Sequence, residues 1–113
     1  MNQSQLESVR ITLEAERARL LADLAEPPSA PSQMTYGSQA AAASEVFAQQ
    51  RDLALRDKSG KGLDLVDDAL ARLAAGTYGT CLRCARPIPD ERLEALPWAA
   101  FDLACQQLER DGR

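Results

Sequence analysis

Histidine is absent from this sequence, and aromatic residues make up only 4% of its 113 residues. Alanine and leucine supply most of the apolar residues. Such a composition suits long helices that pack along stripes, and it does not suit a thick globular core. Without histidine, a visible nucleophile–base pair or an expected pocket, the chain lacks the usual components of an active site. We therefore do not expect an enzyme.

The sequence also lacks an excess of basic charge and any long apolar run. Its net charge is −4 and its pI is about 4.8, whereas a protein held to DNA by phosphate contacts needs a basic face. No segment approaches the length of a membrane span, and the N-terminus MNQSQLESVR has no apolar signal region. We expect a cytoplasmic protein that binds neither DNA nor membranes.

Two long helical patterns dominate the first two thirds of the chain. Residues 4–26 predict a helix of roughly 33 Å, with Ser4 and Glu7 as a capping box and Pro27 after its end. The loop-like segment 27–38 contains three prolines. A second helix is predicted from Gln39 to Ala75, with Gly76 as its left-handed cap.

Each pattern carries one apolar stripe, and two such helices most simply form an antiparallel hairpin. The first stripe comprises Leu6, Val9, Leu13, Leu20 and Leu24. The second comprises Val46, Leu53, Leu63, Val66, Leu70 and Leu73. Gly60 and Gly62 interrupt the second helix, where we expect a kink or a frayed turn. A phosphate loop is not favoured, because no strand precedes these glycines.

The remaining residues predict a short cysteine-bearing segment and one more helix. That helix is expected from about Pro97 to Arg110, with Pro97 in its first turn and four apolar groups, Trp98, Phe101, Leu103 and Leu108. The expected fold is mainly α: an antiparallel coiled-coil hairpin over residues 1–75, then a small zinc-finger-like module with a C-terminal helix over 76–113. The hairpin tip is expected at about 27–43.

A metal site is suggested by three cysteines and one acid. Cys81 and Cys84 form a Cys-x-x-Cys pair, and Asp102 and Cys105 follow after a gap of 17 residues. Paired ligands separated by about 15 to 20 residues are typical of tetrahedral zinc. Aspartate can bind zinc through oxygen at about 2.0–2.2 Å, although less tightly than a thiolate. We therefore expect Zn²⁺ on these four residues.

Two alternatives stay open at this point. The site could have lost its metal, leaving Asp102 as a surface acid and the cysteines as small buried groups. Ala85 favours that view, because the residue after a second knuckle cysteine often needs a positive φ angle, which alanine resists. Alternatively, Cys81 and Cys84 could form a reversible dithiol, although the usual βαβ context is missing.

Residues 76–105 resemble the zinc-finger signature of the bacterial DksA/TraR family. The resemblance rests on Gly76-x-Tyr78-Gly79-x-Cys81, Ala69-Leu70-x-x-Leu73, Ile88, Arg92-Leu93-Glu94-Ala95 and Pro97. It implies a transcription factor that binds RNA polymerase directly and does not bind DNA. Family members insert a coiled-coil hairpin into the secondary channel, so that its tip lies near the catalytic centre and alters open-complex stability.

Several positions depart from the family pattern. The tip motif D-x-x-D-x-A falls on Ser38, Ala41 and Ala43, so only its alanine is kept. Positions matched to basic residues of ppGpp-responsive members hold Leu96 and Gln106, which does not favour an alarmone response. A regulator acting on RNA polymerase is the leading hypothesis. The alternative is a metal- or thiol-responsive cysteine module without polymerase activity. DNA binding through the three arginines of the finger ranks last: Arg83, Arg86 and Arg92.

Overall fold

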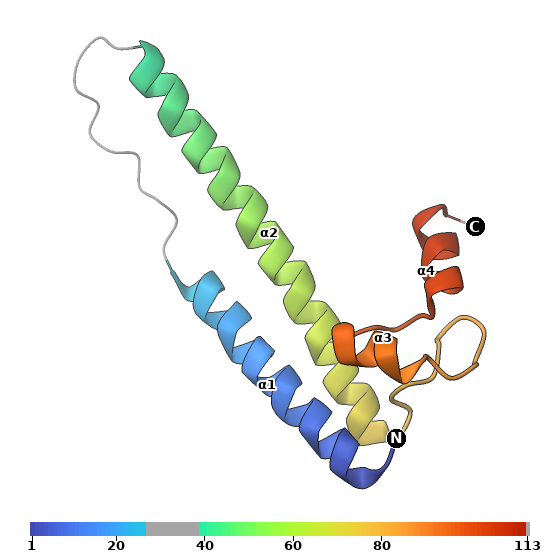
Figure 1. Cartoon of the computed structure of the whole chain (residues 1–113). Coiled ribbons are helices and arrows are strands. Elements are labelled where there is room, and N and C mark those ends of the chain that lie inside the picture. The colour runs from blue at the N-terminus through green and yellow to red at the C-terminus, as the bar shows by residue number, and fades with distance from the viewer. Residues whose placement is uncertain (27–38, 113) are drawn as a thin grey trace.

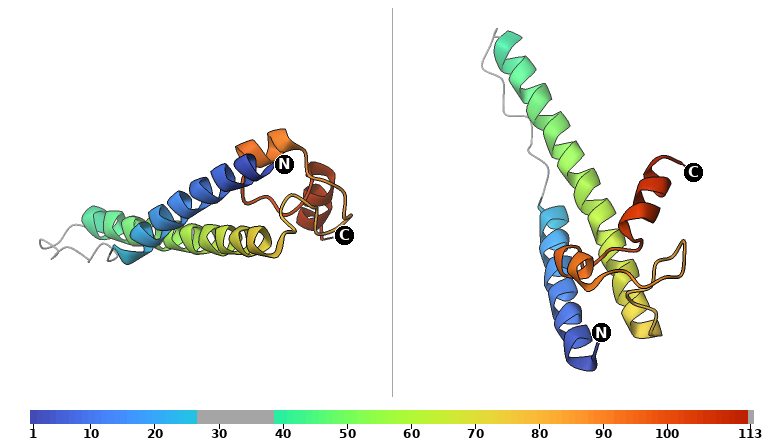
Figure 2. Two further views of the ribbon diagram at one scale, coloured as in Figure 1. Left: turned by 90° about the horizontal axis from the view of Figure 1, so that it is seen from below. Right: turned by 45° about the vertical axis from the view of Figure 1, so that its right-hand side comes forward.

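The computed structural model describes residues 1–26 and 39–112 (Figure 1). Within these residues it contains four helices: α1 (Gln3–Ala25), α2 (Gln39–Ala75), α3 (Asp90–Ala95) and α4 (Leu103–Arg110). Helices α1 and α2 lie side by side and antiparallel, and the two short helices follow at the end where α2 stops (Figures 1 and 2). The predicted mainly α fold, a helical hairpin followed by a small cysteine module and a C-terminal helix, is confirmed. No helix in the described ranges is long and apolar enough to cross a membrane.

The N-terminal cap of α1 differs from the predicted one. Asn2 accepts a hydrogen bond from the backbone N–H of Gln5, and the Gln5 side chain accepts one from the backbone N–H of Asn2, both at 2.8 Å. This reciprocal pair is a capping box. The predicted box of Ser4 and Glu7 is wrong, because both residues already lie inside the helix.

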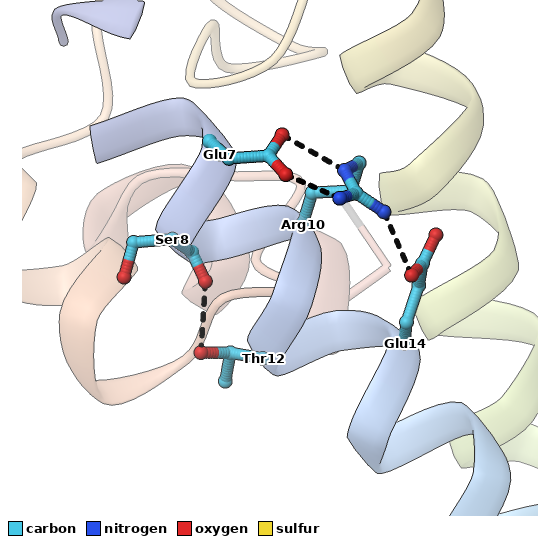
Figure 3. A network of polar contacts seen from close by, with 5 residues as sticks. All are labelled: Glu7, Ser8, Arg10, Thr12 and Glu14. Carbon is cyan, nitrogen blue, oxygen red and sulfur yellow. Dashed lines mark hydrogen bonds and ion pairs between the residues drawn. The ribbon is translucent and has the colours of Figure 1, made fainter. Parts of the chain in front are cut away.

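Glu7 belongs instead to an ion-pair network along the exposed face of α1. Arg10 lies between Glu7 and Glu14 and contacts both, at 2.9 Å from its Nε to Glu7 Oε2 and 2.8 Å from its Nη1 to Glu14 Oε2 (Figure 3). The guanidinium holds the pKa of Glu7 below its ordinary value. Thr12 donates back to the Ser8 carbonyl, one turn away. Because the ion pairs are exposed, they add little to the free energy of unfolding.

The seam between α1 and α2 is apolar near the module. Leu13, Leu20, Val66 and Ala69 are fully or almost fully buried there. Partly buried apolar side chains surround this cluster: Val9, Leu63, Leu70, Leu73, Tyr78 and Trp98. Here the predicted stripes are confirmed on both helices.

Toward the N-terminal half of α2 the predicted stripe is wrong. Val46 is 51% exposed and Leu53 is 65% exposed. The alternating spacing of three and four that connects Leu73, Leu70, Val66 and Leu63 continues onto polar side chains instead. These half-buried positions are Ser59, Arg56, Asp52, Gln49 and Glu45. Val46 and Leu53 each lie one residue past such a position, so the helix turns them away from the seam.

Helix α2 runs unbroken through its two internal glycines, so the expected frayed turn is wrong. A Cβ on Gly62 would lie 3.5 Å from both terminal methyl carbons of Leu20, an ordinary contact distance. The predicted left-handed cap at Gly76 is confirmed, with φ of 76°. The N–H of Thr77 bonds to the Arg72 carbonyl at 2.9 Å, and that of Gly76 to Leu73 at 3.3 Å. This is the Schellman arrangement, which satisfies the last carbonyls of the helix.

The predicted final helix starts too early. Residues 96–102 are not helical, and α4 begins only at Leu103, with Asp102 as its N-cap. Pro97 disfavours the helical region at the preceding residue, so Leu96 takes φ −132° and ends the short helix α3. Helix α3 is not among the helices predicted from the sequence. Trp98 and Phe101 are partly buried as expected, but Leu103 is 60% exposed.

Candidate metal centre

A tight turn after α2 positions the first two cysteines. The N–H of Cys81 bonds to the Arg86 carbonyl at 2.9 Å, and the N–H of Ala85 returns to the Cys81 carbonyl at 3.0 Å. Thr80 and Pro87 form an isolated antiparallel bridge that closes the base of the turn. These bonds bring the Cys81 and Cys84 side chains to the same side of the loop.

Ala85 occupies the left-handed region expected at this position. Its φ is 62°, whereas the other positive φ angles of the described residues fall on glycine. An alanine in this region costs roughly 1 kcal/mol relative to glycine. The turn therefore has the backbone shape of a metal knuckle with alanine, not the permissive glycine, at this position.

Helix α4 supplies the other two side chains from its first turn. The Asp102 Oδ1 accepts the backbone N–H of Cys105 at 2.8 Å, which caps the helix. The Asp102 Oδ2 lies 3.1 Å from the Cys84 Sγ and so faces the first cysteine pair. The expectation that a lapsed site would leave Asp102 as a plain surface acid does not match this position.

The four predicted ligands converge. The three sulfur atoms and one carboxylate oxygen of Cys81, Cys84, Asp102 and Cys105 all lie within 4.8 Å of one another. All three cysteines are free thiols. Around a tetrahedral ion with zinc–sulfur bonds of about 2.3 Å, neighbouring sulfurs stand about 3.8 Å apart, so only a small contraction separates this arrangement from a metal site. The donor set fits Zn²⁺.

The pKa values of Cys81 and Cys105 are shifted in opposite directions. Burial raises the pKa of Cys81, but the N–H groups of Cys84, Asp102 and Arg83 oppose it, and the pKa falls to about 7. Burial, reinforced by the Asp102 carboxylate, raises the pKa of Cys105 to about 12. Such N–H donors aimed at a sulfur stabilise a thiolate, which is the form that binds metal.

The candidate metal site adjoins a small apolar cluster. Cys81 and Cys105 are themselves buried in it together with Ile88, Leu93 and Ala99. Four further side chains are partly buried against the cluster: Tyr78, Cys84, Leu96 and Phe101. The module therefore has a small core of its own, in which two of the candidate ligands take part.

Three side-chain hydrogen-bond donors, none of them predicted from the sequence, bind backbone carbonyls of the segment between α3 and α4. Arg92 donates to the Phe101 carbonyl at 2.9 Å, and Tyr78 donates to the Pro97 carbonyl at 2.9 Å. Arg72 of α2 lies 3.4 Å from the Trp98 carbonyl oxygen, at the limit of a hydrogen bond. A residue pattern in the sequence could not predict these contacts, because they depend on the positions of carbonyl groups outside the helices.

Comparison with known proteins agrees with this architecture. The family model of the prokaryotic DksA/TraR C4-type zinc finger matches residues 76–109. The RNA polymerase-binding transcription factor DksA of Caulobacter vibrioides is 32% identical over 109 residues, which cover 95% of this chain and 77% of that protein. The chain belongs to the DksA/TraR family. A C4-type finger is named for four cysteines, whereas this chain has three cysteines, which converge with Asp102.

Solved DksA structures share the whole arrangement. DksA2 from Pseudomonas aeruginosa superposes with a TM-score of 0.73 at 30% identity, covering 100% of this chain and 90% of that one. The RNA polymerase-binding regulator of Chlamydia trachomatis, at 20% identity and a TM-score of 0.66, shares the fold. An uncharacterised Aquifex aeolicus protein is 43% identical over 47 residues, and this chain spans 32% of its length.

Two of the three predicted tip positions, Ala41 and Ala43, lie at the end of α2 that is remote from the cysteine module. Ser38 is outside the described residues, and Ala41 belongs to α2 with its side chain outside the described part. Ala43 lies in the first turns of α2 and is exposed. Leu96 and Gln106, the positions matched to basic residues, are both partly buried in the module.

Proposed function

We propose that this DksA/TraR family member is a transcription regulator that binds RNA polymerase directly and modulates initiation by inserting its hairpin into the secondary channel. The observation that carries the proposal is similarity over nearly the whole chain to a DksA named for RNA polymerase binding. The match covers 95% of this chain, so it includes the hairpin as well as the finger. The proposal includes a cytoplasmic location and no direct binding to DNA or membranes, and it does not favour a ppGpp response.

The shape of the hairpin supports insertion. Helix α2 has 37 residues, about 55 Å at 1.5 Å per residue. It extends beyond the end of α1, while the module lies at the opposite end (Figure 1). The molecule measures 62 × 32 × 20 Å. A thin rod with a broad base is the form required of a probe that enters a pore and stops at its rim.

Zinc has a structural role in this proposal. Cys81, Cys84, Asp102 and Cys105 would hold the ion, and the bound ion would cross-link the loop after α2 to the start of α4. The protein then consists of two functional units, the hairpin over residues 1–75 with its tip at 27–43 and the module over 76–113. The hairpin reaches the partner, and the module sets its orientation.

The second candidate function is a metal- or thiol-responsive module that does not act on polymerase. The observation that favours it is the packing of three free thiols and a carboxylate within 4.8 Å. Both acidic positions of the family's tip motif are replaced, by Ser38 and Ala41, which is consistent with a chain that has lost the polymerase effect. The two functions differ in whether polymerase associates at all.

Size-exclusion co-elution with the cognate core RNA polymerase tests the proposal. We expect co-elution at micromolar concentrations, abolished by an excess of a known secondary-channel binder. Ala43→Arg, near the tip end, should weaken association, whereas the matched Ala71→Arg on an exposed position of α2 near the module should not. Absence of co-elution for the zinc-loaded protein would overturn the proposal and favour the responsive module. Co-elution that the competitor does not affect would reject the secondary channel.

A further inference from the structure

The two oxygens of the Asp102 carboxylate face different partners. The Oδ1 accepts the Cys105 N–H at 2.8 Å, whereas the Oδ2 lies 3.1 Å from the Cys84 Sγ, among the thiols. The first contact fixes the start of α4, and the second belongs to the candidate metal site. The Asp102 side chain therefore contacts the helix start and the candidate metal site at the same time.

We propose that Asp102 performs two separate tasks at the same time: its Oδ2 is the fourth metal ligand, and its Oδ1 is the N-cap of α4. The replacement of the family's cysteine then preserves the metal site and adds a stronger helix cap than the cysteine provides. This inference rests on the zinc site proposed above and is independent of polymerase binding.

The chemistry of the two side chains explains why the carboxylate does both tasks better than a cysteine. An ionised carboxylate has two acceptor oxygens with about four lone-pair sites, so one oxygen can bind a metal while the other accepts an N–H. Aspartate is among the preferred N-cap residues. A metal-bound cysteine has a single sulfur, which is a weak acceptor, and cysteine is not a preferred N-cap residue.

The cap also prepares the ligand. Because Cys105 is both the donor of the capping N–H and a candidate ligand, the bond at 2.8 Å fixes the Asp102 carboxylate relative to the Cys105 sulfur before any ion arrives. Outer contacts that orient a metal ligand in this way commonly change metal affinity by about 10- to 100-fold. The loss of a softer donor is therefore partly offset by a better oriented one.

The rest of the site supports retained metal binding. Ala85 keeps its φ of 62° despite the strain, and its N–H returns to the Cys81 carbonyl at 3.0 Å, which closes the turn between the first two cysteines. Strained backbone of this kind persists where a functional site requires the conformation. In Asp102 and Ala85 the chain departs from the family pattern, and at both positions the structure keeps the geometry of the site.

Four proteins separate the two tasks: wild type, Asp102→Asn, Asp102→Ala and Asp102→Cys. Asparagine caps a helix as well as aspartate but is a poor zinc ligand, alanine does neither, and cysteine binds metal but caps only weakly. Affinity is measured by Co²⁺ titration under reducing conditions, followed by Zn²⁺ competition, with cobalt–thiolate absorption as the signal. Cap strength is measured by melting the metal-free proteins in chelator, followed through Trp98, the single tryptophan.

We expect wild type to bind one ion per chain and Asp102→Asn to bind at least about tenfold more weakly. Metal-free Asp102→Asn should melt within about 1 °C of wild type, while Asp102→Ala and Asp102→Cys should melt about 4 °C lower. Asp102→Cys should bind metal at least as tightly as wild type. In the zinc-loaded state, amide exchange at Cys105 should be faster in Asp102→Cys than in wild type, which reports the cap even if the metal-free module does not melt cooperatively.

Each contrary result has its own meaning. Wild type without metal would overturn the zinc site and this inference together. Equal metal affinity for wild type and Asp102→Asn would overturn the ligand task alone. Equal metal-free melting of Asp102→Ala and Asp102→Asn, with unchanged Cys105 exchange in Asp102→Cys, would overturn the cap. None of these results bears on polymerase co-elution, which tests the proposed function separately.

Discussion

The Tyr78 hydroxyl donates a hydrogen bond of 2.9 Å to the backbone oxygen of Pro97. The ring of Tyr78 packs against both apolar clusters, the one in the hairpin and the one behind the cysteines. Trp98, next to Pro97, packs against the hairpin cluster. Tyr78 therefore joins the module to the base of the hairpin, and its hydroxyl fixes the segment that leads to Asp102.

Substitution of Tyr78 by phenylalanine should weaken this junction. The change removes one hydrogen bond and leaves a partly buried carbonyl without that donor, so we expect the free energy of unfolding to fall by about 1 kcal/mol. Urea denaturation followed by Trp98 fluorescence measures it. An unchanged midpoint would show that solvent satisfies the Pro97 carbonyl equally well.

The same residue predicts an alkaline pH dependence. Burial raises the pKa of Tyr78 above its ordinary value of 10.0. The unfolded chain loses the phenolic proton first, so this stabilising contribution is complete below about pH 10 and declines as the pH rises through the folded-state pKa. We expect stability to fall less steeply in Tyr78→Phe than in wild type above that pH. Parallel pH profiles of the two proteins would contradict the prediction.

Arg56 caps the end of α1 from the neighbouring helix. Its guanidinium donates to the backbone oxygens of Leu24 and Glu26, where α1 runs out of internal donors. Arg56→Met should therefore lower the free energy of unfolding by about 1 kcal/mol, since charged donors to helix carbonyls are favourable. Arg51→Met, an exposed position on the same helix, is the matched control and should have little effect. Equal losses in the two variants would argue against a cap.

Substitution of the internal glycines of α2 by alanine is expected to stabilise the protein. A methyl group on Gly60 would meet no heavy atom within 4 Å, and one on Gly62 would make only ordinary contact with Leu20. Each lies within continuous helix, so Gly60→Ala and Gly62→Ala should stabilise the protein by about 0.5–1 kcal/mol each. Gly76→Ala should instead destabilise it, because φ there is 76°. Thermal melting compares the three, and destabilisation by Gly60→Ala would indicate a bend that the helix needs.

Metal removal should affect the module more than the hairpin. The described contacts within α1 and α2 do not involve the cysteines, so a chelator should leave most of the far-UV helical signal intact. The environment of Trp98 should change, because the segment from Pro97 to Asp102 links the metal site to the hairpin cluster. Circular dichroism and fluorescence recorded together test this. Loss of both signals in parallel would show that the two units unfold as one.

How far the sequence predicts the structure depends on how local each feature is. Gly76, the Cys-x-x-Cys pair and the spacing to Cys105 are local patterns: the structure confirms the left-handed cap at Gly76 and brings the three cysteines and Asp102 together. The start and end of α3 are also locally marked, by Pro89 with acidic residues after it and by Leu96 before Pro97. The apolar groups beyond Pro97 favour one longer helix instead, and that prediction is wrong.

Other features could not be predicted because they depend on a helix partner. Val46 and Leu53 form an apolar pair seven residues apart that competes with the true seam, and only the position of Leu63 and Val66 against α1 shows which frame is used. The carbonyls that Arg72 and Tyr78 bind exist as acceptors only once the segment after α3 has folded. The division of Asp102 between two partners requires α4 to begin where it does.

The apolar contacts between α1 and α2 are concentrated at the end of the hairpin next to the module. Leu13, Leu20, Val66 and Ala69 are buried there, whereas the half-buried positions farther along α2 are polar and lie past Arg56, which contacts the end of α1. Amide hydrogens should therefore exchange slowly around Val66 and progressively faster toward Glu45.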